Sequence, residues 1–165
     1  MGKVFVRVDD RLIHGQIVTA WCQTLGIQQI IAIDDELASN PVLQSIMTMG
    51  VPGQYNPRIM TVADAKKLLT DGSDRTRLVI VRFTRVLDEL REELKGCEHI
   101  NLGNSSKLDD SLYKFARGGA WFVYLSQADW DVLQQLAADG HMIMSQNLPQ
   151  EKRSDWDSIQ KSISK

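Results

Sequence analysis

The sequence is poor in cysteine. Its two cysteines, Cys22 and Cys97, lie far apart and form no Cys-x-x-Cys pair. Disulfide frameworks and cysteine-based zinc sites need more thiols, at shorter and recurring spacings. We therefore expect two reduced thiols, neither a disulfide nor a zinc site, and a cytoplasmic setting.

Long hydrophobic runs are also missing. Although 43% of the residues are hydrophobic, no run approaches the ~20 apolar residues that a membrane-spanning helix needs. The first residues lead almost directly into an apolar segment and show no charged-then-apolar leader. We expect no direct membrane insertion. If the protein serves a membrane transporter, it would do so as a subunit associated with the membrane peripherally.

Charge of one sign is not in excess. Nineteen Lys and Arg residues face 21 Asp and Glu residues, which gives a formal net charge of −2, and neither end carries a basic or acidic tail. This distribution does not favour nucleic-acid binding. Linkers, internal repeats and low-complexity segments are absent as well. The length and the hydrophobic content predict a single domain over residues 1–165.

Strand-like and helix-like segments alternate along the chain. Short apolar runs rich in β-branched residues predict strands at 3–8, 28–33, 57–62, 77–83, 98–102, 120–125 and 142–144. Helices are expected at 17–25, 41–49, 64–69, 84–94, 126–140 and from 154 onward. Residues 103–117 are polar and show little pattern. The alternation favours a three-layer α/β/α fold with a mostly parallel seven-stranded sheet.

One stretch, residues 8–16, combines a histidine with an arginine between an expected strand and an expected helix. The free N–H groups and the dipole of a helix N-terminus attract anions. Arg11 adds a planar set of donors that suits phosphate. A neutral imidazole at position 14 has a ring nitrogen free to attack. We therefore predict that His14 accepts a phosphoryl group and passes it on.

Other interpretations of this stretch stay open. Asp9, Asp10 and Arg11 are also compatible with a purely structural cluster of caps and salt bridges. Asp9, Asp10 and His14 could be imagined as ligands in a metal-dependent phosphohydrolase. However, the side chains of adjacent residues at a strand end diverge, which argues against a metal. His99 and His141 lie in or beside strands, and we expect both to be packed or hydrogen-bonded.

The run from Arg7 to Gln16, followed by Trp21 and by residues 30–35, resembles the signature of the enzyme IIB components of the bacterial sugar phosphotransferase system, mannose/fructose/sorbose family. The order of the expected elements and the total length also fit a single IIB domain. Two departures stand out. Gly103-Asn104 occupies a place where the family commonly has two glycines, and Arg85-Val86 follows Thr84 where the family often has Asn-Pro.

The resemblance implies a function. His14 would receive a phosphoryl group at Nδ1 from a histidine of a phosphorylated IIA protein and hand it to a sugar hydroxyl during uptake. Membrane IIC and IID subunits would be the other partners, and no cofactor or metal would be required. The resemblance also implies that the strand at 120–125 runs antiparallel at one edge of the sheet. A non-catalytic regulatory module that senses phosphate or sugar phosphate is the alternative function.

Five residues are expected to support His14. Arg11 would contact the phosphate, Gly15 and Gln16 would offer backbone N–H groups, and Asp9 would hold Arg11 in place. Thr84 would donate its hydroxyl from a neighbouring loop, with helix capping as its alternative role.

Two further expectations concern arginines. Arg7 is expected to pair with Asp34 or Asp35. The docking face for an acidic partner is expected around His14, at Arg11, Arg82, Arg85 and Lys107.

Overall fold

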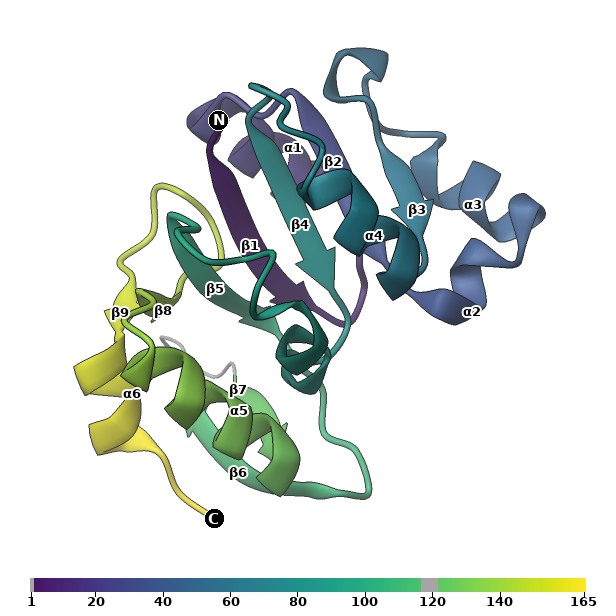
Figure 1. Cartoon of the computed structure of the whole chain (residues 1–165). Coiled ribbons are helices and arrows are strands. Elements are labelled where there is room, and N and C mark those ends of the chain that lie inside the picture. The colour runs from purple at the N-terminus through teal and green to yellow at the C-terminus, as the bar shows by residue number, and fades with distance from the viewer. Residues whose placement is uncertain (1, 117–121) are drawn as a thin grey trace.

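The computed structural model describes residues 2–116 and 122–165, with only the backbone at positions 16 and 17. Its main sheet has seven strands in the order β3-β2-β4-β1-β5-β8-β9 (Figure 1). The strands are β1 (Val4–Asp9), β2 (Gln29–Ile33), β3 (Arg58–Met60), β4 (Arg77–Val81), β5 (His99–Asn104), β8 (Ile143–Ser145) and β9 (Ser154–Asp155). Neighbouring strands are parallel except for the edge pair β8 and β9. This confirms the predicted sheet.

Helices lie on both faces of this sheet. They are α1 (Gly15–Leu25), α2 (Asp35–Ala38), α3 (Pro41–Thr48), α4 (Val62–Leu69), α5 (Gln127–Ala138) and α6 (Trp156–Ser162), with two 3₁₀-helices, η1 (Gly53–Tyr55) and η2 (Thr84–Leu90). Successive side chains of a strand point to opposite faces. Along β4, Leu78 and Ile80 accordingly join one hydrophobic cluster with α1, whereas Val79 and Val81 join another with α4, η2 and α5. The three layers are therefore as expected.

The centre of the sheet explains why the apolar runs predicted it well. Every residue of β2 and of β4 is buried. A parallel strand covered by helices on both faces needs apolar side chains in both directions, so it shows a continuous run and no alternation.

The expectation for the strand at 120–125 was wrong in its placement. Its described part, β7 (Phe122–Ser126), pairs antiparallel with β6 (Ser111–Ala116) in a separate two-stranded sheet, and positions 120 and 121 lie outside the described residues. The antiparallel edge strand of the main sheet is β9. No local pattern indicates β6, because Phe115 is its only buried residue and the strand lacks apolar alternation.

The segment at 84–94 also differs from expectation. It begins with the 3₁₀-helix η2 and continues in turns, where an α-helix was predicted. The buried residues of η2 are Thr84, Leu87 and Leu90, which recur at every third position, the period of a 3₁₀-helix. Thr84 is the first residue of η2 and not its cap.

Two other helices begin away from their predicted starts: α4 begins at Val62, two residues before the predicted start, and α6 begins at Trp156, after the strand β9 at residues predicted to be helical. Three helix ends have clear local caps. Asn40 caps α3, since its side chain accepts a hydrogen bond from the Leu43 N–H, and Pro41 follows it. Ser126 and Asp129 form a reciprocal capping box at the start of α5. Gly26 ends α1 in the left-handed conformation.

Candidate active site

His14 lies at the turn from β1 to α1, as expected. It is the residue that precedes the first turn of α1, and its side chain makes no capping hydrogen bond. The N–H groups of the first helical turn have no intrahelical partner, so they face outward at the positive end of the helix dipole. The chain moves from β1 to β2 and β3 on one side and later to β5 and β8 on the other, so β1 lies where the strand order reverses. Ligands of open α/β sheets bind at such points.

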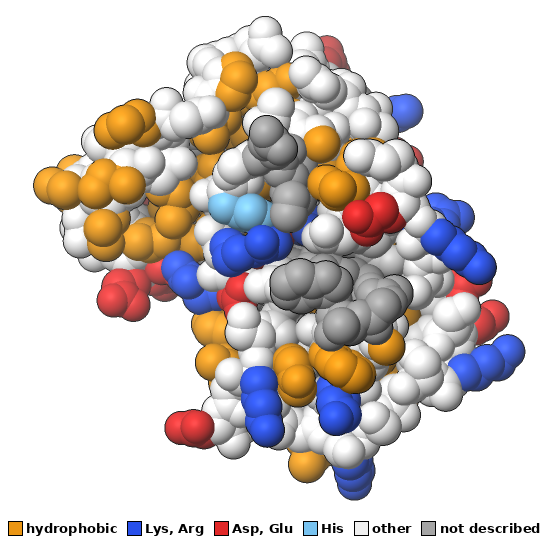
Figure 2. Space-filling view, turned by 180° about the vertical axis from the view of Figure 1, so that it is seen from behind, with side chains coloured by type: hydrophobic (Ala, Val, Ile, Leu, Met, Phe, Trp, Pro, Cys, Tyr) orange, Lys and Arg blue, Asp and Glu red, His pale blue; other side chains and the backbone are white. Residues whose placement is uncertain are grey.

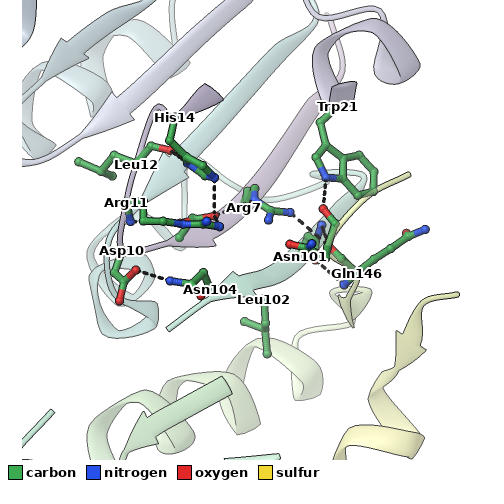
Figure 3. A network of polar contacts seen from close by, with 12 residues as sticks. Arg7, Asp10, Arg11, Leu12, His14, Trp21, Asn101, Leu102, Asn104 and Gln146 are labelled. Atoms are coloured by element: carbon green, nitrogen blue, oxygen red, sulfur yellow. Dashed lines mark hydrogen bonds and ion pairs between the residues drawn. The ribbon is translucent and has the colours of Figure 1, made fainter. Parts of the chain in front are cut away.

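The imidazole ring of His14 has different surroundings at its two nitrogens. Nδ1 lies 3.0 Å from the backbone carbonyl oxygen of Leu12. Nε2 is buried, makes no hydrogen bond and lies 3.7 Å from Oδ2 of Asp9. The side chain is 20% exposed. In Figure 3 the ring points toward the guanidinium end of Arg11.

The pKa of His14 lies below its ordinary value, mainly because burial disfavours the charged ring. Arg11 and Arg7 lower the pKa further, whereas Asp9 and the carbonyl of Leu12 raise it. Burial, and not Arg11, is thus the largest cause of the lowered pKa. A lowered pKa keeps the imidazole neutral near pH 7, which is the nucleophilic form.

Asp9 is the centre of the polar contacts around His14. Its side chain is fully buried and accepts hydrogen bonds from the Arg11 backbone N–H (3.0 Å), from Arg11 Nε (3.1 Å) and Nη2 (3.2 Å), and from Arg7 Nε (3.3 Å). Arg11 itself is 42% exposed. Asp9 therefore fixes a half-exposed guanidinium beside the imidazole.

Leu12 shapes the turn in a way that sequence reasoning missed. It is fully buried and has a φ of 55°, a left-handed conformation that is rare for a branched side chain. This conformation places its carbonyl against His14 Nδ1. Strain of this kind collects at functional sites, and no pattern in the residue letters indicates it.

The comparisons with known proteins agree on one family. Residues 3–165 match the model of the PTS system sorbose subfamily IIB component. The chain belongs to this IIB family. A probable phosphotransferase enzyme IIB component of Streptococcus pyogenes serotype M6 is 32% identical over 108 residues, 64% of this chain and 66% of that protein. The mannose-specific EIIAB component of Escherichia coli K12 is 30% identical over 82 residues, 50% of this chain and 25% of that protein. The matched stretches thus span less than two thirds of these relatives.

Solved structures of other proteins have the same fold as this chain. The crystal structure of manxB from Thermoanaerobacter tengcongensis superimposes with a TM-score of 0.82 at 24% identity, and covers 98% of this chain and 96% of that one. An N-acetyl-galactosamine IIB component from Streptococcus pyogenes superimposes with a TM-score of 0.79 at 26% identity, over 95% and 96% of the two chains. In the part of this IIB chain that the structure describes, no helix has both the length and the apolar character to cross a membrane.

Arg7 does not pair as predicted in this IIB chain. It is fully buried, donates to Asp9, and reaches the carbonyl oxygen of Gln146 through Nη1 at 3.2 Å (Figure 3). Asp34 instead pairs with Arg82 at 2.9 Å. The reason is the strand period, because Arg7 and Asp9 are two residues apart on β1 and share a face.

Both residues at 103–104 have a structural role, although only Asn104 departs from the family pattern. Gly103 borders Arg7 so closely that a side chain there would overlap the guanidinium group. Asn104 donates to Oδ1 of Asp10, whose Oδ2 accepts from the Ser106 N–H at 2.8 Å. Asp10 is therefore bound to the end of β5 and does not join Asp9 and His14. Among residues 2–116 and 122–165, no group of three His, Cys, Asp or Glu side chains is placed to hold a metal ion.

The other predicted supporting residues lie in different places. Gly15 is the first residue of α1 and has a φ of 34°, with open space around the position of a Cβ atom. Gln16 follows it, so its N–H also belongs to the first turn. Thr84 is buried at the start of η2. Its side chain makes no hydrogen bond to the described residues. The phosphate contacts of these three residues stay predictions.

The remaining histidines are packed or hydrogen-bonded, as expected. His99 lies against the rings of Phe5 and Trp21, and burial lowers its pKa to about 4. His141 Nδ1 lies 3.4 Å from the Sγ atom of Cys97.

Proposed function

We propose that this IIB chain carries a phosphoryl group on His14 in a sugar-transporting phosphotransferase system. It takes the group from a phosphorylated IIA protein and gives it to a sugar that membrane IIC and IID subunits bring. The observation that carries this proposal is the position of the His14 imidazole at the start of α1, beside the exposed part of Arg11 and the free N–H groups of the first turn. Membership of the sorbose subfamily supports the same function.

Histidine is a better acceptor here than either cysteine. Cys22 is fully buried, and burial raises the pKa of its thiol to about 12. Burial also raises the pKa of Cys97 to about 11. Only the thiolate of a cysteine is nucleophilic. At neutral pH neither thiol is ionised to a useful extent, whereas His14 is in the neutral form that a nucleophilic ring nitrogen requires.

The transfer is a simple exchange of bonds. The nitrogen–phosphorus bond on the donor histidine breaks, and the lone pair of a ring nitrogen of His14 forms the new bond to phosphorus. The donor nitrogen recovers its lone pair. Positioning and charge stabilisation provide most of the catalysis in such a step, so a metal or cofactor is not needed for it.

Attack by Nδ1 requires a small rearrangement of the ring. In the structure Nδ1 faces the carbonyl oxygen of Leu12, which can only accept a hydrogen bond, so Nδ1 carries the proton. Before attack, the ring must turn away from Leu12 and hold its proton on Nε2. The carboxylate of Asp9 lies 3.7 Å from Nε2. When the two side chains move slightly closer, this carboxylate accepts a hydrogen bond from the Nε2–H group.

Arg11 and Arg7 have different roles beside Asp9. Arg11 is half-exposed and can turn its guanidinium from Asp9 to the new phosphate, where a charge-assisted hydrogen bond is strong. Arg7 is buried and stays on Asp9. The buried carboxylate therefore keeps a cation beside it when Arg11 leaves.

The test is the intact mass of the protein after incubation with phosphorylated IIA protein. We expect the mass of one phosphoryl group on the wild-type chain and none on a folded His14→Ala variant. His141→Ala is the matched control and should gain the group as the wild type does. A phosphoryl group retained by folded His14→Ala would refute the assignment. An unmodified wild-type chain that still binds phosphate would favour the regulatory alternative.

A further inference from the structure

Helix α3 exposes most of its apolar side chains. None of its eight residues is buried. Val42 is 68% exposed, Leu43 43%, Ile46 60%, and Met49, directly after the helix, 79%. Figure 2 shows apolar side chains gathered over one lobe of the molecule, next to a histidine and to basic side chains. Single exposed apolar residues are common, but a contiguous group marks an interaction surface. We call these four residues the α3 face.

The α3 face is continuous with the acceptor histidine. Leu43, Ile46 and Met47 line one hollow together with Ile13 and His14. His14 is the only residue with a polar side chain among the described residues that line it. Whatever covers α3 therefore also reaches the ring of His14.

The chemistry of the hollow selects the kind of occupant. A sugar site needs several side chains that donate or accept hydrogen bonds, and the aliphatic walls offer none. A membrane surface attracts amphipathic helices with basic residues. Helix α3 has no Lys or Arg, and the neighbouring α2 begins with Asp35 and Glu36. A protein with an apolar surface of its own fits best.

We propose that the α3 face is the docking surface for the phosphoryl-donor protein, which presents an apolar surface beside its phosphorylated residue. This inference rests on the proposed function of His14. Two partners must reach His14, and they differ in charge. The donor arrives with a negatively charged phosphoryl group, whereas the sugar hydroxyl that accepts this group carries no charge. The apolar face lies next to His14 together with the half-exposed guanidinium of Arg11, which suits the charged donor.

The experiment measures how the rate of His14 phosphorylation depends on the concentration of a phosphorylated IIA protein that is active on the wild-type chain. Ile46→Glu and Met49→Glu place a charge on the α3 face at exposed positions, so the fold should tolerate them. We expect each to raise the KM for the donor about tenfold or more, with little change in the maximum rate. Met142→Glu is the matched control, because Met142 is 51% exposed and does not line the hollow. It should behave as the wild type.

A small phosphoryl donor separates this inference from the proposed function. Phosphoramidate needs no docking surface, so it should phosphorylate His14 equally in the wild type and in both α3 variants. If it does, and the KM for the IIA protein is unchanged in both variants, the docking inference is wrong while the proposed function stands. If neither donor modifies His14 in the wild type, both fail. Normal uptake of the phosphoryl group by the variants, with impaired delivery to sugar in membranes containing IIC and IID, would assign the face to the membrane subunits and overturn the inference.

Discussion

Gly103 leaves the space that the guanidinium group of Arg7 fills. A Cβ atom at position 103 would lie 2.5 Å from Arg7 Cζ and 2.6 Å from its Nη2. Arg7 donates to Asp9, which in turn holds Arg11 beside His14. A glycine on β5 thus sets the geometry of the turn that follows β1.

Gly103→Ala should therefore weaken both stability and phosphorylation. The added methyl group displaces a buried guanidinium, and overpacking of this kind costs about 1–3 kcal/mol of unfolding free energy. The displaced Arg7 also loosens Asp9, so we expect slower phosphorylation of His14. Urea unfolding and the initial rate with a phosphorylated IIA protein are the measurements.

Gly53→Ala is the matched control for this substitution. A Cβ atom at position 53 would meet no atom within 4 Å, so stability and rate should stay near those of the wild type. Wild-type stability and rate in Gly103→Ala would show that Arg7 does not depend on this contact.

Arg11→Gln should raise the pKa of His14 and slow its phosphorylation. In the wild type we expect His14 to titrate below its ordinary value of 6.5, since burial and Arg11 both disfavour the protonated ring. Without the guanidinium, the negative charge of Asp9 stabilises the protonated ring more strongly, so the titration midpoint of His14 moves to a higher pH. It also removes a donor to the phosphate, and the rate should fall at least about tenfold. NMR titration of the ring protons and the initial rate test the two effects.

Arg11→Lys separates charge from geometry in the same experiment. It keeps the positive charge but loses the planar set of donors. It should therefore keep the low pKa of His14 and recover only part of the rate. An unchanged His14 midpoint in Arg11→Gln would contradict the electrostatic role given to Arg11.

His99 should make the protein less stable in acid. Its pKa is lowered to about 4 in the folded state, mainly by burial, against about 6.5 in the unfolded chain. The unfolded chain therefore takes up a proton first as the pH falls, and the stability present above pH 6.5 is lost between about pH 6.5 and 4. The full loss amounts to about 3 kcal/mol.

Comparison with His99→Phe isolates this contribution. Phenylalanine keeps an aromatic ring against Phe5 and Trp21 but takes up no proton. Urea unfolding at pH 7, 5 and 4 should show a smaller loss of stability in the variant than in the wild type. Equal losses would mean that another group causes the acid sensitivity.

The sequence predicted those parts of the molecule in which a local pattern and the tertiary structure agree. The buried strands β2 and β4 are continuous apolar runs, and the His14 turn lies between a strand and a helix that both have clear signals. The pairing of Arg7 with Asp9 was missed because it depends on which face of β1 the Arg7 side chain lies on. The two-residue spacing nevertheless indicates that Arg7 and Asp9 share one face of the strand.

Other features could not be read from local patterns. Strand β6 is held by its pairing with β7, which lies later in the chain, and its own residues carry no alternation. The conformation of Leu12 and the contact of Gln146 with Arg7 depend on how distant segments meet. The sequence therefore predicted which residues gather around His14, but only some of the contacts that they make.

The most direct test of the central claim is the position of the phosphoryl group on a histidine ring. The chain is labelled with ¹⁵N at its histidines and phosphorylated by IIA protein, and NMR detects coupling between ³¹P and the ring nitrogens. We predict coupling to Nδ1 of His14 and none to His99 or His141. Coupling to another histidine, or a phosphorylated chain without any phosphorus–nitrogen coupling, would contradict the account.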